Sequence, residues 1–240
     1  MRKEVLGVKI DDLKIDEALS IVEKWIWNPG KHYVVTPNPE FLVAAQKDSV
    51  FKSILNKADL SIPDGIGLKI SGKVKNTFSG TDFMEELIKL SSEKGFTVGF
   101  LGGRGEVAKK SAECLMKKYP KLKVGFAESG GEVQAELPGV LSARSIIRNI
   151  PALDILFVAF GHIKQEKWIA NNLNNLPVHI VMGVGGAFDY LSGSVSRAPK
   201  WIRNLGFEWL FRLIIQPWRV KRQLALIKYL FMLIWNNDNS

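Results

Sequence analysis

The chain has 240 residues, 46% of them hydrophobic, and its 33 Lys and Arg outnumber its 24 Asp and Glu to give a net charge of +9. This length and apolar fraction suit one large domain, or one domain with an appendage, and exclude a disordered chain. A single cysteine excludes an internal disulfide, and three widely separated histidines with no HExxH motif argue against a metal site.

The N-terminus and the cysteine indicate the compartment. The first residues, MRKEVLGVKIDD, carry charges inside what would be the apolar core of a signal peptide, so we expect the catalytic body to stay cytoplasmic. Cys114 lies in a helical-looking segment and is interpreted as a small buried hydrophobe, which fits a reducing compartment.

Short apolar runs alternate with amphipathic stretches up to about Gly193. The runs expected to form strands are residues 5–10, 33–36, 60–62, 97–101, 123–127, 153–160 and 179–183. The stretches expected to form helices are residues 15–25, 39–46, 81–92, 107–119 and 165–173. Thr81 or Asp82 is the expected cap of its helix, and residues 128–138 are expected to form a loop. The alternation predicts an α/β fold with a mostly parallel, Rossmann-like sheet flanked by helices.

The first junction that could carry chemistry is TPNPEF, where the strand ending at Thr36 turns into a helix. In open α/β sheets ligands bind beyond the carboxyl ends of the strands, so residues just after each strand are candidates. Asn38 as N-cap and Pro39 at the first helical position make good helix-start chemistry. In the functional interpretation, Thr36 and Asn38 project polar groups into the cleft.

The second junction is IPDGIG, in which Asp64 stands between Pro63 and Gly65. Pro fixes φ and Gly tolerates positive φ, so a tight turn explains the motif. A carboxylate at a strand end, followed by glycines that let a ligand approach, is equally well placed for a general base.

The third junction, FLGGRGEVAKK, places Gly102, Gly103, Arg104 and Gly105 between a strand and a helix. Glycines let the backbone approach a phosphate, and the helix N-terminus offers free N–H groups and a favourable dipole. The string is a weak indication of a nucleotide site, with Glu128 as the only candidate acid for a ribose. A tight turn is the alternative.

Two further junctions, AFGHIKQEKWI and MGVGGAFDYLSG, place Gly161 after one strand and Gly185 and Gly186 after the next. Gln165 lies in the first turn of a helix, where its amide could meet a sugar or phosphate oxygen, or a backbone group of the helix. Asp189 could cap a helix or form an ion pair. Several glycine-opened strand ends indicate a nucleotide-type ligand without naming a reaction.

The C-terminal segment differs from the body. Residues 197–240 hold eight cations against two acids, which is +6 of the net charge, and four of the seven tryptophans. The hydrophobic stretch QLALIKYLFMLIW has thirteen residues and contains Lys228, whereas a bilayer-spanning helix needs about 20 apolar residues. We expect residues 1–193 to form the catalytic domain and residues 194–240 a helical appendage.

The mixture of leucines, aromatics and cations predicts that the appendage lies at a membrane surface. Pro217 predicts a bend, and Arg212, Arg219 and Arg222 would share one helical face if that bend is modest. The alternative is that the apolar face packs on the body or on another copy in a homo-oligomer.

Seven strings between Thr36 and Arg222 occur together in register. They are TPNPEFLVAAQ, ADLSIPDGIGL, SGTDFMEEL, FLGGRGEVA, AFGHIKQEKWI, VGGAFDYLSG and RAPKWIRNLGFEWLFRLIIQPWR. In this order and spacing the chain resembles the WecG/TagA/CpsF family of bacterial glycosyltransferases (glycosyltransferase family 26), and its N-acetylmannosaminyltransferases in particular.

The resemblance implies inverting transfer of N-acetylmannosamine from UDP to undecaprenyl-diphosphate-linked N-acetylglucosamine at the inner face of the cell membrane. The product would feed a teichoic acid linkage unit or a related surface polysaccharide. The alternative is a family member using UDP-N-acetylmannosaminuronate or UDP-glucose. The same similarity puts Asp64 on the family's proposed base, and the other matched site positions are Thr36, Asn38, Gln165, Arg212, Arg219 and Arg222.

One departure from the family pattern concerns a cation. Family members often have Arg-Val-x-Gly before the GTD helix, whereas this chain has Thr77, Phe78, Ser79 and Gly80. The nearest cation in that segment is Lys75.

No DxD motif occurs, so we expect neither a metal nor a cofactor, and the diphosphate charge falls to backbone N–H groups of the Gly-rich loops and to arginines. Nucleic-acid binding is disfavoured because the cations cluster with long aliphatic residues and no RRM, KH or HTH signature occurs. A nicotinamide-dependent oxidoreductase lacks a convincing catalytic His, Lys and Tyr set.

Overall fold

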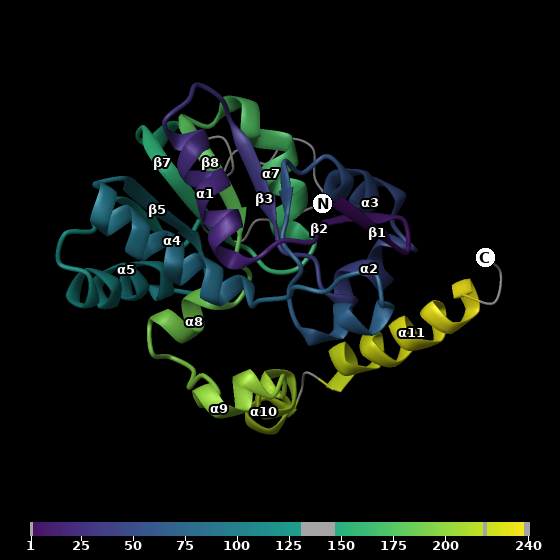
Figure 1. The fold of residues 1–240 in the computed structure, drawn as a ribbon. Coiled ribbons are helices and arrows are strands. Elements are labelled where there is room, and N and C mark those ends of the chain that lie inside the picture. Colours follow the sequence, from purple (N-terminus) through teal and green to yellow (C-terminus); the bar gives the residue numbers. More distant parts are fainter. Residues whose placement is uncertain (1, 131–146, 218–219, 238–240) are drawn as a thin grey trace.

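A computed structural model describes residues 2–130, 147–217 and 220–237, and its centre is a six-stranded parallel sheet with the order β4-β3-β8-β7-β5-β6. The strands are β3 (His32–Val35), β4 (Leu60–Ser61), β5 (Thr97–Gly102), β6 (Lys123–Glu128), β7 (Leu153–Ala159) and β8 (Val178–Gly183). Helices cover both faces of this sheet (Figure 1). The prediction of a parallel α/β sheet is confirmed.

Strand β7 shows why the sheet is buried on both sides. It pairs with β5 on one side and β8 on the other, so it has no free edge. Leu156 and Val158 pack into one hydrophobic cluster, while Ile155 and Phe157 pack into the other. Because successive side chains of a strand point to opposite faces, a run that is apolar at every position fits only a strand covered twice.

The helices divide between the two faces. One face is covered by α1 (Ile15–Ile26), α4 (Gly80–Lys94), α5 (Val107–Lys118) and α8 (Ala187–Leu191). The other is covered by α2 (Pro39–Ala45), α3 (Ser49–Asn56), α7 (Lys164–Asn172) with the 3-10 turn η2 (Leu173–Asn175), and part of α11 (Val220–Asn237). The expected cap of α4 was wrong, because Ser79 fills that position and its Oγ accepts from the Thr81 backbone N–H.

The prediction of one strand over residues 5–10 is also wrong. Residues 5–10 belong to a hairpin of β1 (Arg2–Val5) and β2 (Val8–Asp11), which pair antiparallel in a separate two-stranded sheet. Leu6 and Gly7 form the turn with φ of 50° and 74°, and positive φ at both central residues matches the twist of the flanking strands.

Cys114 is exposed, which corrects its interpretation as a buried hydrophobe. The buried stripe of α5 consists of Ala108, Ser111, Ala112 and Leu115. Cys114 lies off this i, i+3, i+4, i+7 stripe and therefore faces outward.

The C-terminal segment forms α9 (Lys200–Asn204), α10 (Glu208–Ile215) and α11. Helix α10 ends before Gln216 and Pro217, so the predicted bend is confirmed as a helix end. Arg212 of α10 and Arg222 of α11 therefore lie on separate helices. Arg219 lies outside the described residues, as do the side chain of Arg222 and residues 131–138 of the expected loop.

Helix α11 packs along α2 (Figure 1). Tyr229 is fully buried there and belongs to the hydrophobic cluster on that face of the sheet. The opposite face of α11 is apolar and exposed, with Leu224, Ile227, Phe231 and Ile234. Across the described residues, no helix is both long and apolar enough to cross a bilayer.

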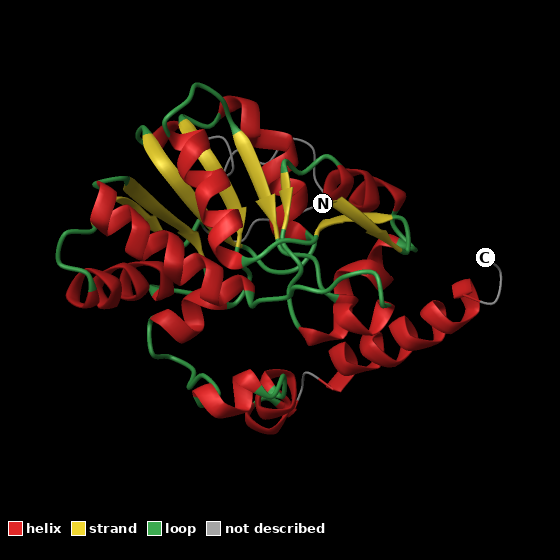
Figure 2. Cartoon of the chain, in the orientation of Figure 1, coloured by secondary structure: helices red, strands yellow, loops and turns green. Residues whose placement is uncertain are grey.

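The carboxyl ends of the strands face the C-terminal helices. In Figure 2 the arrowheads point toward the side of the molecule where α8, α9 and α10 lie. The 3-10 helix η1 (Ile66–Ser71) follows β4 at this end, and Gly206 of the α9–α10 turn packs against Ile66.

Candidate active site

Asp64 lies just beyond the carboxyl end of the parallel sheet. The pairing of β3 and β4 continues past the strands, since the Ile62 N–H donates to the Val35 carbonyl at 2.8 Å and the Asp64 N–H to the Pro37 carbonyl at 3.0 Å. On its other side, Phe78 donates its N–H to the carbonyl of Pro63 at 3.2 Å. The backbone around Asp64 is thus fixed by hydrogen bonds from two sides.

Asp64 is partly exposed as a residue, but its carboxylate lies in surroundings that change its pKa. Its Oδ1 accepts from the Gly80 backbone N–H at 3.1 Å. Burial is the largest influence on the pKa of Asp64 and raises it, the negative charge of Glu208 acts in the same direction, and the pKa resulting from all influences is about 6. The Gly80 N–H, a side-chain hydrogen bond from Asn38 and the charge of Arg212 act in the opposite direction. The group is ionised at neutral pH and more basic than an ordinary aspartate.

Thr36 and Asn38 flank this carboxylate. A Cβ on Gly80 would lie 3.1 Å from Cγ2 of Thr36, so the buried Thr36 side chain packs against the residue whose N–H reaches Asp64. Asn38 caps α2, with its Oδ1 accepting from the Phe41 N–H at 3.1 Å, and also bonds Asp64. The structural and functional interpretations of TPNPEF therefore apply together.

Arg212 reaches the same place from α10. Its guanidinium carbon lies 4.8 Å from the ring centre of Tyr190, a cation–π distance. A Cβ on Gly186 would lie only 2.8 Å from Nη2 of Arg212, so the end of the arginine side chain lies directly against the loop after β8. Its Nε is buried with no hydrogen-bond partner among the described residues. This cation beside Asp64 suits a ligand with negative charge.

Gln165 is committed to contacts within the protein. The side chain is buried, its Nε2 donates to Oε1 of Glu166 at 2.7 Å, and its Oε1 accepts from the Gly185 N–H at 2.9 Å. The amide therefore ties the start of α7 to the loop after β8. Of the two interpretations of Gln165, the geometry supports contact with the backbone.

The Gly-rich loops follow β5, β7 and β8, near the point where the strand order reverses. From β5 the chain continues to β6 on one side, whereas from the adjacent β7 it continues to β8 on the other side. In such folds ligands bind in the crevice between these two connections. Gly102 has φ of 111° and a Cβ there would lie 2.7 Å from the backbone of Ala159, so close packing requires glycine. Gly103 donates its N–H to the Ala159 carbonyl. The tight-turn alternative thus explains this pair.

The remaining predicted residues lie around this crevice in more open positions. Gly105, Gly161 and Gly185 have no atom within 4 Å of an added Cβ among the described residues, and Arg104 is exposed. The Gly103 and Gly185 N–H groups donate to acceptors inside the protein, the Ala159 carbonyl and the Gln165 side chain. Glu128 is exposed and pairs in register with Leu101 at the sheet edge.

Sequence reasoning missed a polar cluster beside Asp64. Arg197 bonds Asp82 and Glu208 at 2.8 and 3.2 Å, and Arg203 bonds Asp82 at 2.9 Å. The only indication in the sequence was the presence of arginines in an otherwise apolar segment. These cations contact Ser79 and Asp82 at the start of α4, so the C-terminal segment brings positive charge to the region that follows Thr77.

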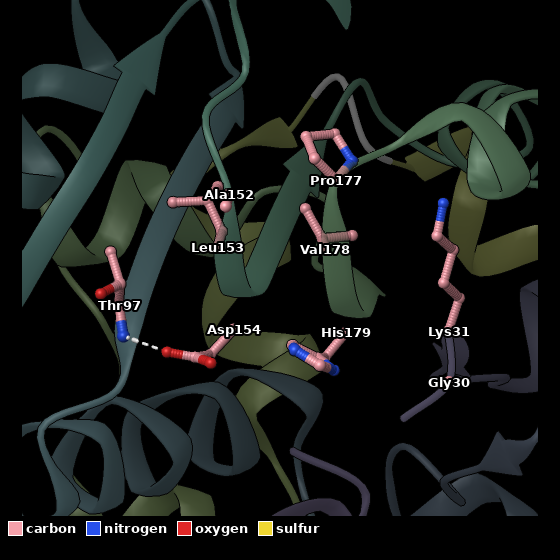
Figure 3. A pocket seen from close by; sticks show the side chains of 9 residues that line it. All are labelled: Gly30, Lys31, Thr97, Ala152, Leu153, Asp154, Pro177, Val178 and His179. Atoms are coloured by element: carbon pink, nitrogen blue, oxygen red, sulfur yellow. Dashed lines mark hydrogen bonds between the residues drawn. The ribbon is translucent and has the colours of Figure 1, made fainter. Parts of the chain in front are cut away.

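A pocket of about 320 Å³ lies at the amino ends of the strands, opposite the end that carries Asp64 (Figure 3). Its lining includes the first residues of three strands, Thr97, Leu153 and Val178, and the Thr97 N–H donates to Oδ2 of Asp154 at 2.7 Å. Because ligands of open α/β sheets bind at the carboxyl ends, we do not assign the chemistry to this pocket. Within the described part of the chain, no group of three or more His, Cys, Asp and Glu side chains is placed to hold a metal ion.

Comparison with known proteins identifies the family. Residues 3–239 match the family described as Glycosyl transferase WecG/TagA/CpsF family. The chain is 34% identical over 223 residues to the N-acetylglucosaminyldiphosphoundecaprenol N-acetyl-beta-D-mannosaminyltransferase of Bacillus subtilis (strain 168), covering 88% of this chain and 85% of that protein. Proteins of the same name from Bacillus spizizenii (strain ATCC 23059 / NRRL B-14472 / W23) and Staphylococcus aureus (strain MRSA252) are 31% and 28% identical, over 82% and 91% of this chain and 76% and 87% of their own lengths. The chain belongs to the WecG/TagA/CpsF family and is a glycosyltransferase.

Proposed function

We propose that this enzyme transfers N-acetyl-D-mannosamine from UDP-N-acetylmannosamine to undecaprenyl-diphosphate-linked N-acetylglucosamine, with inversion to a β-linkage. The names of the relatives supply the donor sugar and the acceptor. The observation that carries the proposal is the Asp64 carboxylate, more basic than usual, at the carboxyl end of a parallel sheet and beside Arg212. The product would enter the teichoic acid linkage unit or a related cell-surface polysaccharide.

In the proposed reaction Asp64 is the general base. The acceptor hydroxyl oxygen bonds to the anomeric carbon as the bond from that carbon to the diphosphate oxygen breaks, and UDP leaves with the electron pair. The proton of the hydroxyl passes to Asp64, a transfer typically worth 10²–10⁴-fold in rate. Thr36 and Asn38 hold the carboxylate, and Arg212 neutralises charge that develops on the diphosphate.

The glycines of the crevice shape the diphosphate site. Gly102 and Gly103 fix the loop after β5, and Gly105 and Gly161 leave room beside it for a ligand. Gln165 fixes the loop after β8, including Gly185, and Gly186 makes room for Arg212. We propose three further cations for the diphosphate. One is the exposed Arg104, and the others are Arg219 and Arg222, whose side chains are not among those described. We propose that the reaction requires neither a metal nor a cofactor.

The appendage, residues 194–240, is proposed to hold the cytoplasmic enzyme peripherally at the inner face of the cell membrane. One face of α11 packs on the body, which leaves Leu224, Ile227, Phe231 and Ile234 exposed on the other. Exposed apolar side chains near cations such as Lys228 suit a surface of anionic lipid, where each nearby cation contributes about 1 kcal/mol. A lipid-linked acceptor lies at that surface.

The proposal is tested with purified protein, a short-chain lipid-diphosphate-N-acetylglucosamine acceptor and a panel of UDP-sugars, with and without EDTA. We expect disaccharide-lipid from UDP-N-acetylmannosamine and an unchanged rate in EDTA. Product from UDP-N-acetylmannosaminuronate or UDP-glucose instead would replace the donor, and loss of activity in EDTA would refute the metal-free mechanism.

A further inference from the structure

A cluster of charged side chains joins the C-terminal segment to the first turn of α4. Arg197 lies at its centre: Nη1 donates to Oδ1 of Asp82 at 2.8 Å, Nη2 to Oγ of Ser79 at 3.3 Å, and Nε to Oε1 of Glu208 at 3.2 Å. Arg203 donates to the same oxygen of Asp82 at 2.9 Å. One guanidinium group thus connects α10 to the start of α4 through three hydrogen bonds.

Both ends of this cluster lead to Asp64. On the α4 side, Ser79 caps the helix whose first residue, Gly80, donates its N–H to Asp64. On the α10 side, Glu208 and Arg212 are four residues apart, so they share one face of the helix. The charges of both act on Asp64, in opposite directions.

Polar contacts hold α10 at this position, and none of its apolar side chains, all of which are described, is fully buried. Trp209, Leu210, Ile214 and Ile215 are exposed. A helix without a buried face gains little from core packing. The partly buried, charge-assisted bonds of Arg197 are the stronger kind of hydrogen bond and fix direction as well as distance.

We propose that Arg197 and Glu208 are positioning residues of the transfer reaction: Arg197 clamps Glu208 to the start of α4, and this clamp sets Arg212 beside Asp64. The inference rests on the proposed roles of Asp64 and Arg212 and adds to them the part that places the two groups together. Neither positioning residue touches the substrate in this scheme.

The groups that face Asp64 predict the effect of removing Glu208. These are Asn38 from the start of α2, the Gly80 N–H from α4, and Glu208 and Arg212 from α10. Glu208→Gln removes the one negative charge among them, so Asp64 loses its proton at lower pH. The acidic limb of kcat/KM should move to lower pH, and the plateau rate should fall because a weaker base accepts the proton less readily.

The clamp itself is tested by a double-mutant cycle in the full-length enzyme with UDP-N-acetylmannosamine and the lipid acceptor. We expect Arg197→Gln to lower kcat/KM about 10- to 100-fold, since a displacement of about 1 Å at a reacting group has costs of this size. Arg197→Gln combined with Arg212→Gln should be no slower than Arg212→Gln alone, because Arg197 acts through Arg212. Multiplicative effects of the two substitutions would overturn the proposal.

Controls separate positioning from folding. Lys94, the last residue of α4, forms an ion pair with Glu23 of α1 at the end of α4 that is far from the cluster. Lys94→Gln breaks this pair and should leave kcat/KM unchanged. Should Arg197→Gln fail to fold, Arg197→Lys keeps the charge but cannot span three partners, and it should lower kcat while its thermal midpoint stays near wild type. Wild-type kcat in that folded variant would overturn the proposal.

Failure of this proposal differs from failure of the proposed function. If Asp64→Asn and Arg212→Gln abolish transfer but Arg197→Gln and Glu208→Gln keep wild-type rates and pH profiles, only the clamp is refuted. If Asp64→Asn transfers sugar normally, the proposed base is refuted whatever the clamp variants do.

Discussion

Asp64 owes its chemistry to opposing influences on a single carboxyl group. Loss of hydration and the charge of Glu208 favour the protonated form, while the Gly80 N–H, Asn38 and Arg212 favour the ionised form. Burial dominates, and the resulting pKa of about 6 makes the group a better base than a solvated aspartate while keeping it ionised at pH 7. A general base is most effective with a pKa in this range.

The pH dependence of the wild-type enzyme follows from this pKa. Because the base must be ionised, kcat/KM should fall tenfold per pH unit below about pH 6 and level off above it. The measurement is the rate of disaccharide-lipid formation at low substrate between pH 4.5 and 8. An acidic limb that instead bends near pH 4, the range of an ordinary aspartate, would contradict the assigned environment.

For single residues, the sequence predicts where a side chain lies in the fold better than it predicts the hydrogen-bond partners of that side chain. Asp64 at a strand end and Asn38 as a cap follow from local rules about strand ends and helix starts. The contacts of Arg197 and Arg203 with Asp82 join residues 115 and 121 positions apart, and no local pattern indicates them. The internal hydrogen bonds of Gln165 likewise depend on a loop twenty residues away.

The start of α7 supports the crevice at the scale of an element. Ile163 has φ of 68°, a conformation that costs a branched residue roughly 1–3 kcal/mol. Glu166, three residues later, accepts hydrogen bonds from the backbone N–H groups of Ile163 and of itself, as in one half of a capping box. Through Gln165 this turn holds the loop after β8.

Glu166 makes this element sensitive to pH. Burial raises the pKa of Glu166 to about 7 from an ordinary value of 4.5, and its Oε2 has no hydrogen-bond partner among the described residues. The folded protein therefore keeps a proton that the unfolded chain loses above pH 4.5, so the free energy of unfolding falls between about pH 4.5 and 7.

Glu166→Gln should remove this contribution while keeping an oxygen for Gln165. Above pH 7 the variant should be more stable than wild type by on the order of 3 kcal/mol, and at pH 4 the two should be similar. Urea unfolding at the two pH values measures the difference. A variant less stable than wild type at pH 8 would mean that the ionised carboxylate is stabilised by its surroundings.

Elements with one strong local pattern could be predicted from the sequence. The six sheet strands and five helices expected from apolar runs and amphipathic stretches all form, with ends within two residues of those predicted. The hairpin of β1 and β2 was missed because Leu6 adopts a positive φ that its residue type disfavours. The helix α3, with one buried turn of Phe51 and Leu55, and the 3-10 helix η1 have patterns too short to stand out.

At the scale of the whole molecule, the C-terminal helices bring charge and apolar surface to the end of the sheet that carries Asp64. Arg212 and Glu208 come from α10, and α11 covers α2 with one face and exposes the other. The composition of the tail predicted this difference between tail and body, but not the clamp between them.

The membrane proposal predicts the effect of charge on the exposed face of α11. Ile227→Asp with Phe231→Asp should reduce co-flotation with anionic liposomes several-fold, since each buried apolar side chain contributes about 1.5–3 kcal/mol. Trp27→Asp, whose parent side chain is 66% exposed against 68% for Phe231, is the matched control and should float like wild type. Unchanged flotation of the α11 variant would refute docking through this face.

The most direct test of the account is the transfer rate of Asp64→Asn with UDP-N-acetylmannosamine and the lipid acceptor. We predict a loss of about 10²–10⁴-fold. The fold should persist, because the pKa of Asp64 is raised from 3.8 to about 6 on folding, so ionisation costs stability above pH 6 and the uncharged variant should unfold at a higher temperature there. A folded Asp64→Asn enzyme that keeps more than about a tenth of the wild-type rate would contradict the assignment of Asp64 as the base.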